Sequence, residues 1–297
     1  MTRQKKQNIL VTGANGFVGH ALTKKLVGNS NLFLVSRDEK FKCSGAKVFY
    51  GDLRNKKFCQ KIVKNIDAVY YLAAFKKNVA VHTGWPFDAI FNNTLPLLTF
   101  LEAAKTSKIK TIIYVSSVLV EYALSQDIQI DGYVIGKYMN ELILKSFEAQ
   151  TKINVKIVRP PAVYGPGNDF NPEVAQVIPF FIMKTAESKD GVVLRSNGKR
   201  RLQFVYIDDF VANLIAIRNS PKNFFVIGND ETIEVKKLVS KIMRLIGKRL
   251  KIHVDLNNKD KPTKLDKFNN LIKPKTSLDA GLQKTLDYYL RYKNKMQ

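Results

Sequence analysis

Residues 9–19, I-L-V-T-G-A-N-G-F-V-G, constrain the fold of this chain more than any other stretch. The apolar start predicts a short buried strand, and three glycines follow at three-residue spacing before A-L-T-K-K-L-V, which has helical periodicity. Glycine permits the backbone angles of a tight turn, the close approach of a pyrophosphate, and close packing of the helix on the strand. The helix N-terminus then offers free N–H groups to phosphates.

This motif predicts a dinucleotide site, and the alternative is a purely structural turn. Its place directly after an apolar strand favours the dinucleotide, because a glycine triplet alone is a weak signal. The residues assigned to the cofactor in this motif are Gly13, Asn15, Gly16, Phe17, Val18 and Gly19.

Length and composition set the remaining limits. With 297 residues and 45% hydrophobic content, the chain has room for one large domain or two smaller ones. No apolar run is long enough to span a bilayer, and M-T-R-Q-K-K-Q leads into the first strand without room for a signal peptide, so no membrane partner is expected. Only Cys43 and Cys59 are present, which favours a reducing cytoplasm over a disulfide framework. We assign no metal ligands.

The net charge of +24 has two interpretations. One is a basic patch that binds nucleic acid, and the other is a solvated surface rich in lysine. The basic residues are spread over every segment, without the basic and aromatic interleaving of a single-strand binder, so no nucleic-acid partner is expected. A positive field would also attract an anionic cofactor and a nucleotide-linked substrate.

Strands and helices alternate through the first half of the chain. Strands are predicted at 31–36, 47–50, 67–74 and 110–117, with a helix at about 87–105. This alternation predicts an α/β fold with a parallel, doubly wound sheet, in which ligands bind at the carboxyl ends of the strands. The residues that fall at those ends are Gly13, Arg37, Asp52, Ala74 and Ser116.

Several of these positions suggest cofactor contacts. Arg37 after the second strand suits the 2′-phosphate of NADP, although Asp38 one residue later keeps NAD possible, and a solvated turn is the alternative. Asp52 is expected to cap the next helix or to hold the adenine amine. Ala73 and Ala74 would let the cofactor approach the strand end, and Asn93 is expected to face the sheet.

The stretch from Phe75 to Phe87 is predicted to be a loop at the same edge. It contains His82, for which a substrate contact is one hypothesis. The alternative is an exposed loop histidine without a role.

Tyr133 and Lys137 open a predicted amphipathic helix that ends near Gln150. Four-residue spacing places both on one helix face. A nearby ammonium favours tyrosinate and is expected to lower the phenol pKa from about 10, which suits proton transfer during hydride transfer. Ser116 could hold the same substrate oxygen. Tyr289 and Lys293 share the spacing, so only the position after the strand that carries Ser116 distinguishes the first pair from two surface residues.

Together these features resemble the extended short-chain dehydrogenases, the NAD-dependent epimerase/dehydratase family, which acts mostly on nucleotide sugars. The segments R-P-P-A-V-Y-G-P-G at 159–167 and F-V-Y-I-D-D-F-V at 204–211 add to the resemblance, which covers nearly the whole chain. It implies that Tyr133 is the acid/base, that Lys137 binds the nicotinamide ribose, and that Ser116 binds the substrate oxygen. It also implies cofactor contacts by Leu53, Asn93 and Pro160, and substrate contacts by His82, Ser117, Gln176 and Arg201.

Within the family, residues 164–179 are similar to GDP-fucose synthases. Those enzymes use a Cys and a His for epimerisation, and here Val118 and Gln176 align with them, so that reaction is not expected. Dehydratases of the family carry an Asp-Glu pair where Ser117 and Val118 stand. The family's arginine before the 204–211 segment is replaced by Leu202, with Arg201 one place early.

The resemblance implies a Rossmann domain at 1–165, with 205–228 returning to it, and a smaller α/β substrate domain at 166–297. The first functional hypothesis is an NADP-preferring reductase of a 4-keto nucleotide sugar. A nucleotide-sugar 4-epimerase with bound NAD is the alternative, and a non-catalytic Rossmann-type binding protein is a third. The family suggests a homodimer through the helices up to and including Tyr133.

Overall fold

The computed structural model describes residues 6–77, 79–124, 131–257 and 266–293. The chain folds into two compact units: one holds Met1–Arg159 and Val211–Phe225, and the other holds Pro160–Phe210 and Val226–Gln297. The chain therefore enters the second unit at Pro160, returns to the first at Val211, and leaves it again after Phe225.

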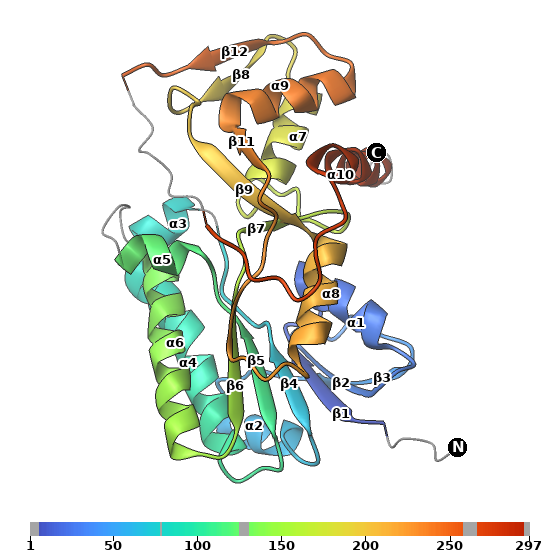
Figure 1. Cartoon of the computed structure of the whole chain (residues 1–297), viewed down its shortest axis with the longest axis vertical. Coiled ribbons are helices and arrows are strands. Elements are labelled where there is room, and N and C mark those ends of the chain that lie inside the picture. The colour runs from blue at the N-terminus through green and yellow to red at the C-terminus, as the bar shows by residue number, and fades with distance from the viewer. Residues whose placement is uncertain (1–5, 78, 125–130, 258–265, 294–297) are drawn as a thin grey trace. The chain divides into compact units, whose positions relative to one another are not determined.

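A seven-stranded sheet forms the centre of the first unit (Figure 1). Its order is β10-β6-β5-β4-β1-β2-β3, and the ladders that join β1 to β6 are parallel. The strands are β1 (Asn8–Thr12), β2 (Asn31–Ser36), β3 (Ala46–Tyr50), β4 (Ala68–Tyr71), β5 (Thr111–Val115), β6 (Asn154–Arg159) and β10 (Phe224–Val226). The strand order reverses between β1 and β4, which confirms the predicted doubly wound sheet and places its ligand crevice at that point.

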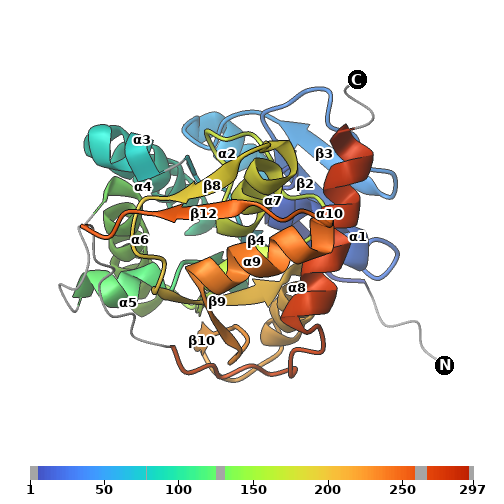
Figure 2. The ribbon, with the colours of Figure 1, turned by 90° about the horizontal axis from the view of Figure 1, so that it is seen from above.

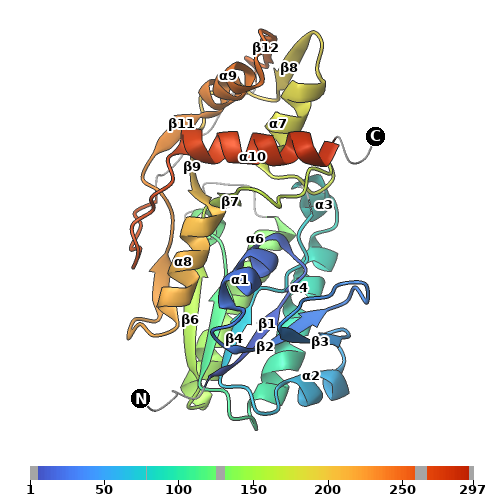
Figure 3. The same cartoon turned by 90° about the vertical axis from the view of Figure 1, so that its right-hand side faces the viewer.

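Helices cover both faces of this sheet, with α1 on one face and α2 and α4 on the other (Figure 3). The helices of this unit are α1 (Phe17–Leu26), α2 (Lys56–Ile62), α3 (Val79–Gly84), α4 (Pro86–Ala104), α5 (Leu119–Leu124) and α6 (Gly132–Gln150). All four residues of β4 are buried, as expected for a parallel strand covered on both faces. The helix α6 packs closely on α4, since a Cβ on Gly132 would lie 2.3 Å from the Pro86 carbonyl oxygen.

Two local predictions in this unit are wrong. Residues 75–87 are not one loop, because α3 forms within them and α4 begins at Pro86, a residue well suited to the first turn of a helix. Asp52 does not cap α2. The N-cap is Asn55, whose side chain accepts the Phe58 N–H at 3.0 Å, whereas the Asp52 carboxylate binds Arg54 at 2.6 Å.

Within the described residues, the second unit contains two small sheets and three helices of its own. One sheet has the order β11-β9-β7, and in the other β12 pairs with β8 in parallel. The strands are β7 (Ala162–Tyr164), β8 (Gly191–Leu194), β9 (Arg201–Tyr206), β11 (Thr232–Glu234) and β12 (Lys251–Val254), and the helices are α7 (Val177–Glu187), α9 (Val235–Ile246) and α10 (Leu278–Lys293). Helices α7, α9 and α10 pack together (Figure 2). The remaining helix, α8 (Ile207–Ile217), crosses the boundary between the units.

For this part of the chain, the sequence pattern predicts helices at 173–187, 209–219 and 231–247, the second of them capped by Asp208 and Asp209, and a loop at 255–275. Three of these predictions need correction. The helix expected at 231–247 begins only at Val235, because residues 232–234 pair with β9 as a strand. Asp208 and Asp209 do not cap α8 from outside, since both lie in its first turn, and the Asp209 carboxylate accepts the N–H groups of Lys275 and Thr276. The helix expected at 173–187 starts at Val177. Of the loop expected at 255–275, residues 258–265 lie outside the described residues.

None of the helices in the described part of the chain combines the length and apolar character needed to cross a lipid bilayer.

Candidate active site

The glycine-rich turn between β1 and α1 has no room for side chains at two positions. Gly13 has a φ of +67°, and a Cβ there would lie 2.9 Å from the Ala73 nitrogen. A Cβ on Gly19 would lie 2.2 Å from the Gly13 carbonyl oxygen. These glycines therefore bring the first turn of α1 close to β1 and β4, as the sequence predicts.

The N-terminus of α1 is open to an anion. Gly16 is the N-cap and supplies no side-chain hydrogen bond, and the first turn contains no acidic residue. The N–H groups of Phe17, Val18 and Gly19 have no acceptor within the helix, because they belong to its first turn. The partial positive charge of this terminus adds to their attraction for phosphate. The turn therefore fits the pyrophosphate of a dinucleotide, because its glycines leave the backbone N–H groups uncovered by side chains.

Some of the polar residues near the ends of β2 and β3 already form hydrogen bonds with neighbouring side chains, and others do not. The Asn15 side chain donates to the Asp38 carboxylate at 3.1 Å, and Asp38 also accepts the Lys40 N–H at 2.9 Å. Hydrogen bonds from Arg54 hold the pKa of Asp52 below its usual value. Arg37 is exposed and forms no ion pair with a described residue. Leu53 is buried.

The segment after β4 is fixed by two buried side chains. The Thr12 hydroxyl accepts the N–H groups of Leu72 at 3.1 Å and Ala73 at 3.2 Å. The Asn93 side chain faces the sheet, as expected, and forms hydrogen bonds of 3.0 Å with both the N–H and the C=O of Phe75. Asn93 therefore positions the strand end beside Gly13, and a direct cofactor contact by this residue stays a prediction.

Helix α6 brings Lys137 against the end of β5. The helix begins at the N-cap Asp131, whose carboxylate accepts the Val134 N–H at 2.8 Å. Lys137 is buried, and its Nζ donates to the Val115 carbonyl at 2.7 Å and lies 5.7 Å from the centre of the Tyr133 ring. Burial, together with the charge of Lys76, lowers the pKa of Lys137 to about 7.

The prediction that Lys137 lowers the pKa of Tyr133 is wrong for the protein without a bound ligand. Burial raises the pKa of the Tyr133 hydroxyl well above its usual value, and the Asp131 charge adds to this effect. The ammonium of Lys137 cannot offset it, because burial also disfavours that charge. Tyr133 is therefore a protonated phenol at neutral pH.

The structure gives Ser116 a different hydrogen-bond partner from the expected substrate oxygen. Its hydroxyl donates to Glu141 Oε1, and Glu141 is held by Arg159 through hydrogen bonds of 2.9 Å and 2.6 Å. Arg159 also reaches Glu121 at 2.8 Å. The next residue, Ser117, accepts the Leu119 N–H at 3.2 Å, which leaves its hydroxyl hydrogen able to donate elsewhere.

His82 is not an exposed loop residue, because it lies in α3 with 3% of its surface exposed. Its Nε2 accepts the Lys77 N–H at 3.0 Å, and its ring centre lies 5.2 Å from that of Tyr133. Burial lowers the pKa of His82, so the ring is neutral at pH 7 and its proton is on Nδ1. That Nδ1 is buried and has no hydrogen-bond partner among the described residues.

The other candidates belong to the second unit. Pro160 is buried, and Gln176 is the N-cap of α7. The Arg201 guanidinium donates to the Thr232 hydroxyl. Since neighbouring strand residues point to opposite faces, Arg201 does not project from the same face of β9 as Leu202. Tyr289, which shares with Lys293 the spacing of the Tyr133–Lys137 pair, is buried. Its hydroxyl donates to Glu187 at 3.2 Å, so its role in α10 is structural.

Sequence reasoning missed Glu141 and Arg159. Glu141 lies four residues after Lys137, on the same helix face, and this spacing was the available signal. Its contact with Ser116 required the packing of α6 on β5 and β6.

A model of the NAD dependent epimerase/dehydratase family matches residues 9–228. The chain belongs to this family. It is an NAD(P)-dependent enzyme of the extended short-chain dehydrogenase type, as its motifs predict.

Relatives within the family include both reductases and epimerases. GDP-L-fucose synthase of Escherichia coli K12 is 22% identical over 329 residues, which cover 98% of this chain and 99% of the relative. dTDP-4-dehydro-6-deoxy-D-allose reductase of a Streptomyces species is 22% identical, with 97% of each chain covered. The structure of UDP-N-acetylglucosamine 4-epimerase from Methanobrevibacter ruminantium M1, in complex with UDP-N-acetylmuramic acid, matches with a TM-score of 0.86 at 23% identity, covering 97% of this chain and 100% of that one. At this identity, the structural match shows a shared fold.

Proposed function

We propose that this enzyme reduces the 4-keto group of a nucleotide-linked sugar and prefers NADPH. The observation that carries the proposal is the pairing of Tyr133 and Lys137 at the carboxyl end of β5, in the unit that also holds the glycine turn. A protonated phenol beside a buried lysine is suited to giving a proton to a developing alkoxide. A relative named as a reductase of a 4-dehydro sugar nucleotide, the Streptomyces dTDP-4-dehydro-6-deoxy-D-allose reductase, supports this choice of substrate class.

The residues of the first unit fit the cofactor. The turn and the open N-terminus of α1 would hold the pyrophosphate, Ala73 and Ala74 would line the path of the nicotinamide, and Lys137 would bind its ribose. When bound, the cofactor supplies the hydride. Leu53, Asn93 and Pro160 stay proposed cofactor contacts. In the second unit, Gln176 and Arg201 stay proposed contacts of the nucleotide part of the substrate.

Arg37 is the proposed reason for a preference for NADPH. Its guanidinium is exposed and has no carboxylate partner within 4 Å in the described chain, whereas neighbouring Asp38 is already bonded to Asn15. A planar guanidinium binds phosphate with two parallel hydrogen bonds. Replacing Arg37 with Met should therefore weaken NADPH binding more than NADH binding.

Tyr133 is the proposed proton donor. Negative charge builds on the carbonyl oxygen during reduction, and the phenol passes its proton to that oxygen. The raised pKa keeps Tyr133 protonated before the reaction. The ammonium form of Lys137 stabilises the tyrosinate that remains, so activity should depend on the protonation of this lysine.

We infer that Ser117, rather than Ser116, donates the second hydrogen bond to the substrate oxygen. The Ser116 hydroxyl has one hydrogen, and it is given to Glu141. The Ser117 hydroxyl only accepts in the described structure and can still donate. Ser116 is then a positioning residue, which ties the end of β5 to the buried Glu141–Arg159 pair.

His82 is the proposed third polar contact. A buried imidazole Nδ1–H without an acceptor costs free energy, about 1–3 kcal/mol, which a substrate oxygen would recover. Its ring lies against Tyr133, so a bound hydroxyl or carbonyl oxygen near the phenol is the expected acceptor. Replacing His82 with Phe should raise the KM for the sugar nucleotide more than it changes NADPH affinity.

A 4-epimerase would use the same three residues and keep NAD bound through each cycle. The first experiment is therefore to denature the purified protein and to identify the released nucleotide by absorbance and mass. Stoichiometric NAD would overturn the reductase proposal in favour of the epimerase. An empty protein that binds NADPH more tightly than NADH supports the reductase, and failure to bind any dinucleotide would contradict both.

A homodimer is the second part of the proposal, and it rests on an exposed apolar face on α4 and α6. The two helices pack together, and Phe87 and Phe91 stack on the surface with ring centres 6.0 Å apart. The large exposed apolar side chains of these two helices and of Trp85, the N-cap of α4, are, with their exposed fractions, Trp85 (67%), Phe87 (73%), Phe91 (43%), Leu98 (46%), Met139 (38%) and Leu142 (45%). Exposed apolar patches of this kind mark interaction sites. Light scattering should give a dimer that Phe87→Glu with Phe91→Glu converts to monomer.

A further inference from the structure

The amino edge of the seven-stranded sheet, where β1, β4 and β5 begin, contains a cavity of about 700 Å³. It lies entirely within the first unit and at the opposite ends of the strands from the glycine turn. The cavity volume is in the range of small-molecule sites in proteins. Its charged lining residues are Lys6, Asp67, Lys108, Lys110 and Arg218.

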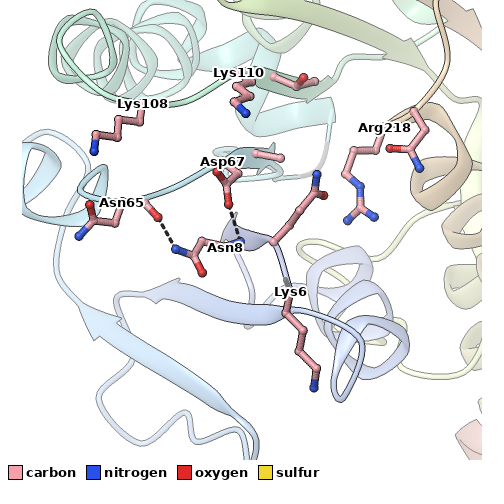
Figure 4. A pocket seen from close by; sticks show the side chains of 11 residues that line it. Lys6, Asn8, Asn65, Asp67, Lys108, Lys110 and Arg218 are labelled. Atoms are coloured by element: carbon pink, nitrogen blue, oxygen red, sulfur yellow. Dashed lines mark hydrogen bonds between the residues drawn. The ribbon is translucent and has the colours of Figure 1, made fainter. Parts of the chain in front are cut away.

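Lysine and arginine side chains outnumber the carboxylate in the lining of this cavity (Figure 4). Lys108, Lys110 and Arg218 form no ion pair within the described part of the chain. The one carboxylate of the lining, Asp67, accepts the Asn8 N–H at 2.9 Å. The Lys6 ammonium donates to the Gly28 carbonyl at 2.6 Å and so contributes less directly. The lining therefore holds three cations that form no ion pair among the described residues, and one carboxylate, which leaves an excess of positive charge that a dianion would balance.

Arg218 supplies the donors that lack a partner. Its Nε and Nη1 atoms are buried, and neither has a hydrogen-bond partner among the described residues. Burial raises the pKa of neighbouring Tyr70, the charge of Arg218 and its side-chain hydrogen bond with the Tyr70 hydroxyl oppose the rise, and the net pKa is about 12. The guanidinium therefore also lies close to the Tyr70 hydroxyl. Unpaired buried donors on a charged group are costly, and a guanidinium matches phosphate oxygens with two parallel hydrogen bonds.

We propose that this cavity binds the phosphate group of a small ligand, separately from the dinucleotide site. A phosphate monoester carries a charge of about −1.5 to −2 at pH 7, which matches the excess of cations. The cations come from two segments far apart in the sequence, Lys108 and Lys110 before β5 and Arg218 after α8, and all three line the same cavity. A nucleic-acid surface would be expected to spread them along a stripe instead. This proposal does not depend on the reaction that the enzyme catalyses.

The test uses isothermal titration of the full chain saturated with NADPH, so that the glycine turn is already occupied. The probes are inorganic phosphate and uridine monophosphate. Arg218→Gln should weaken phosphate binding by about 10-fold or more, because it removes a charged, bidentate donor. Lys110→Gln should weaken it by a smaller factor. The matched control is Lys57→Gln, which changes an exposed lysine of α2 outside the cavity and should leave affinity unchanged.

Each outcome bears on the proposal. For the binding that Arg218→Gln weakens, a higher affinity for the monophosphate would identify a phosphate ester as the ligand, and an equal or higher affinity for inorganic phosphate would identify free phosphate. Monophosphate binding that Arg218→Gln leaves unchanged belongs to the proposed substrate site and would count against the cavity. Equal affinities in wild type and Arg218→Gln, or loss of all phosphate binding on NADPH saturation, would overturn the cavity as the site. Binding of an oligonucleotide but of neither small probe would replace the proposal with a nucleic-acid surface. If Arg218→Gln fails to fold, Lys110→Gln decides.

Discussion

The carboxyl edge of the seven-stranded sheet and its amino edge attract anions by different physical means. At the carboxyl edge, backbone N–H groups of α1 and neutral or weakly charged side chains surround the expected ligand, and burial lowers the pKa of Lys137 to about 7. At the amino edge, Lys108 and Lys110 provide full charges near solvent, and Arg218 provides a partly buried one. In a doubly wound fold, helix N-termini point to the carboxyl edge, so the amino edge lacks those dipoles and must use side chains.

The difference has a consequence for function. Preorganised dipoles in a buried site stabilise charge that develops during a reaction, because they need no reorganisation. Exposed charges attract an anion but are screened by salt and water. We therefore expect chemistry at the carboxyl edge and binding without chemistry at the amino edge.

The largest expected effect is at Tyr133. Tyr133→Phe should lower kcat by about 100–10,000-fold, the range that general acid catalysis supplies, while the Kd for NADPH stays within about twofold. Steady-state kinetics and fluorescence titration give the two numbers. An unchanged kcat would show that Tyr133 is not the acid and would favour a binding protein without chemistry.

The next largest effect concerns the buried Glu141–Arg159 ion pair, which holds Ser116 at the carboxyl edge. Arg159→Met should reduce the free energy of unfolding by about 3–5 kcal/mol, because it leaves the buried Glu141 charge without a partner. Urea denaturation measures the change. The control is Glu121→Gln, which removes the partner whose side chain is 45% exposed and should cost about 0–1 kcal/mol. Similar losses in both variants would contradict the central role of the buried pair.

The two adjacent serines sharpen the comparison further. Ser117→Ala should lower kcat by about 100-fold through loss of a donor to the developing oxyanion, with little change in stability. Ser116→Ala should do the reverse, since it removes a buried hydrogen bond to Glu141 that is worth about 1.5–3 kcal/mol. If Ser116→Ala loses the larger part of kcat, the roles are exchanged and the sequence-based assignment of Ser116 stands.

A smaller effect concerns pH. Because the Lys137 pKa is about 7 in the folded chain and near 10.5 in the unfolded one, the unfolded state binds more protons between these values. The contribution of Lys137 to stability therefore increases as pH rises from 7 to 9, and below 7 it is constant. Urea denaturation at pH 7, 8 and 9 should show a steeper rise for wild type than for Lys137→Met. Parallel curves would contradict the lowered pKa.

The smallest expected effect compares the two edges directly. Raising salt from 50 to 200 mM should weaken phosphate binding at the amino edge by a larger factor than NADPH binding at the carboxyl edge, since exposed charges are screened more. Isothermal titration at both salt concentrations measures the two factors. If salt weakens phosphate and NADPH binding by the same factor, both ligands bind through exposed charges, and the two edges do not differ in the way proposed.

Much of the fold follows from local sequence patterns. The glycine triplet fixes the turn, because Gly13 needs a positive φ and Gly19 leaves no space for a Cβ, and both facts depend on the chain near the motif. Alternating strands and helices predict the parallel sheet for the same reason. Short elements such as α3 and β11 were missed, since six and three residues give too little periodicity to recognise.

The sequence by itself therefore determined the family, the Rossmann architecture, and the pairing of Tyr133 with Lys137, which needs only one helical turn. Tertiary structure alone decided which of two neighbouring serines keeps a hydrogen to donate, because Glu141 and Arg159 reach Ser116 from other elements. It also buried His82 against Tyr133, reversed the expected pKa shift of that tyrosine, and assembled a cationic cavity from distant segments. Burial and long-range charge depend on which segments meet, and no local pattern encodes that.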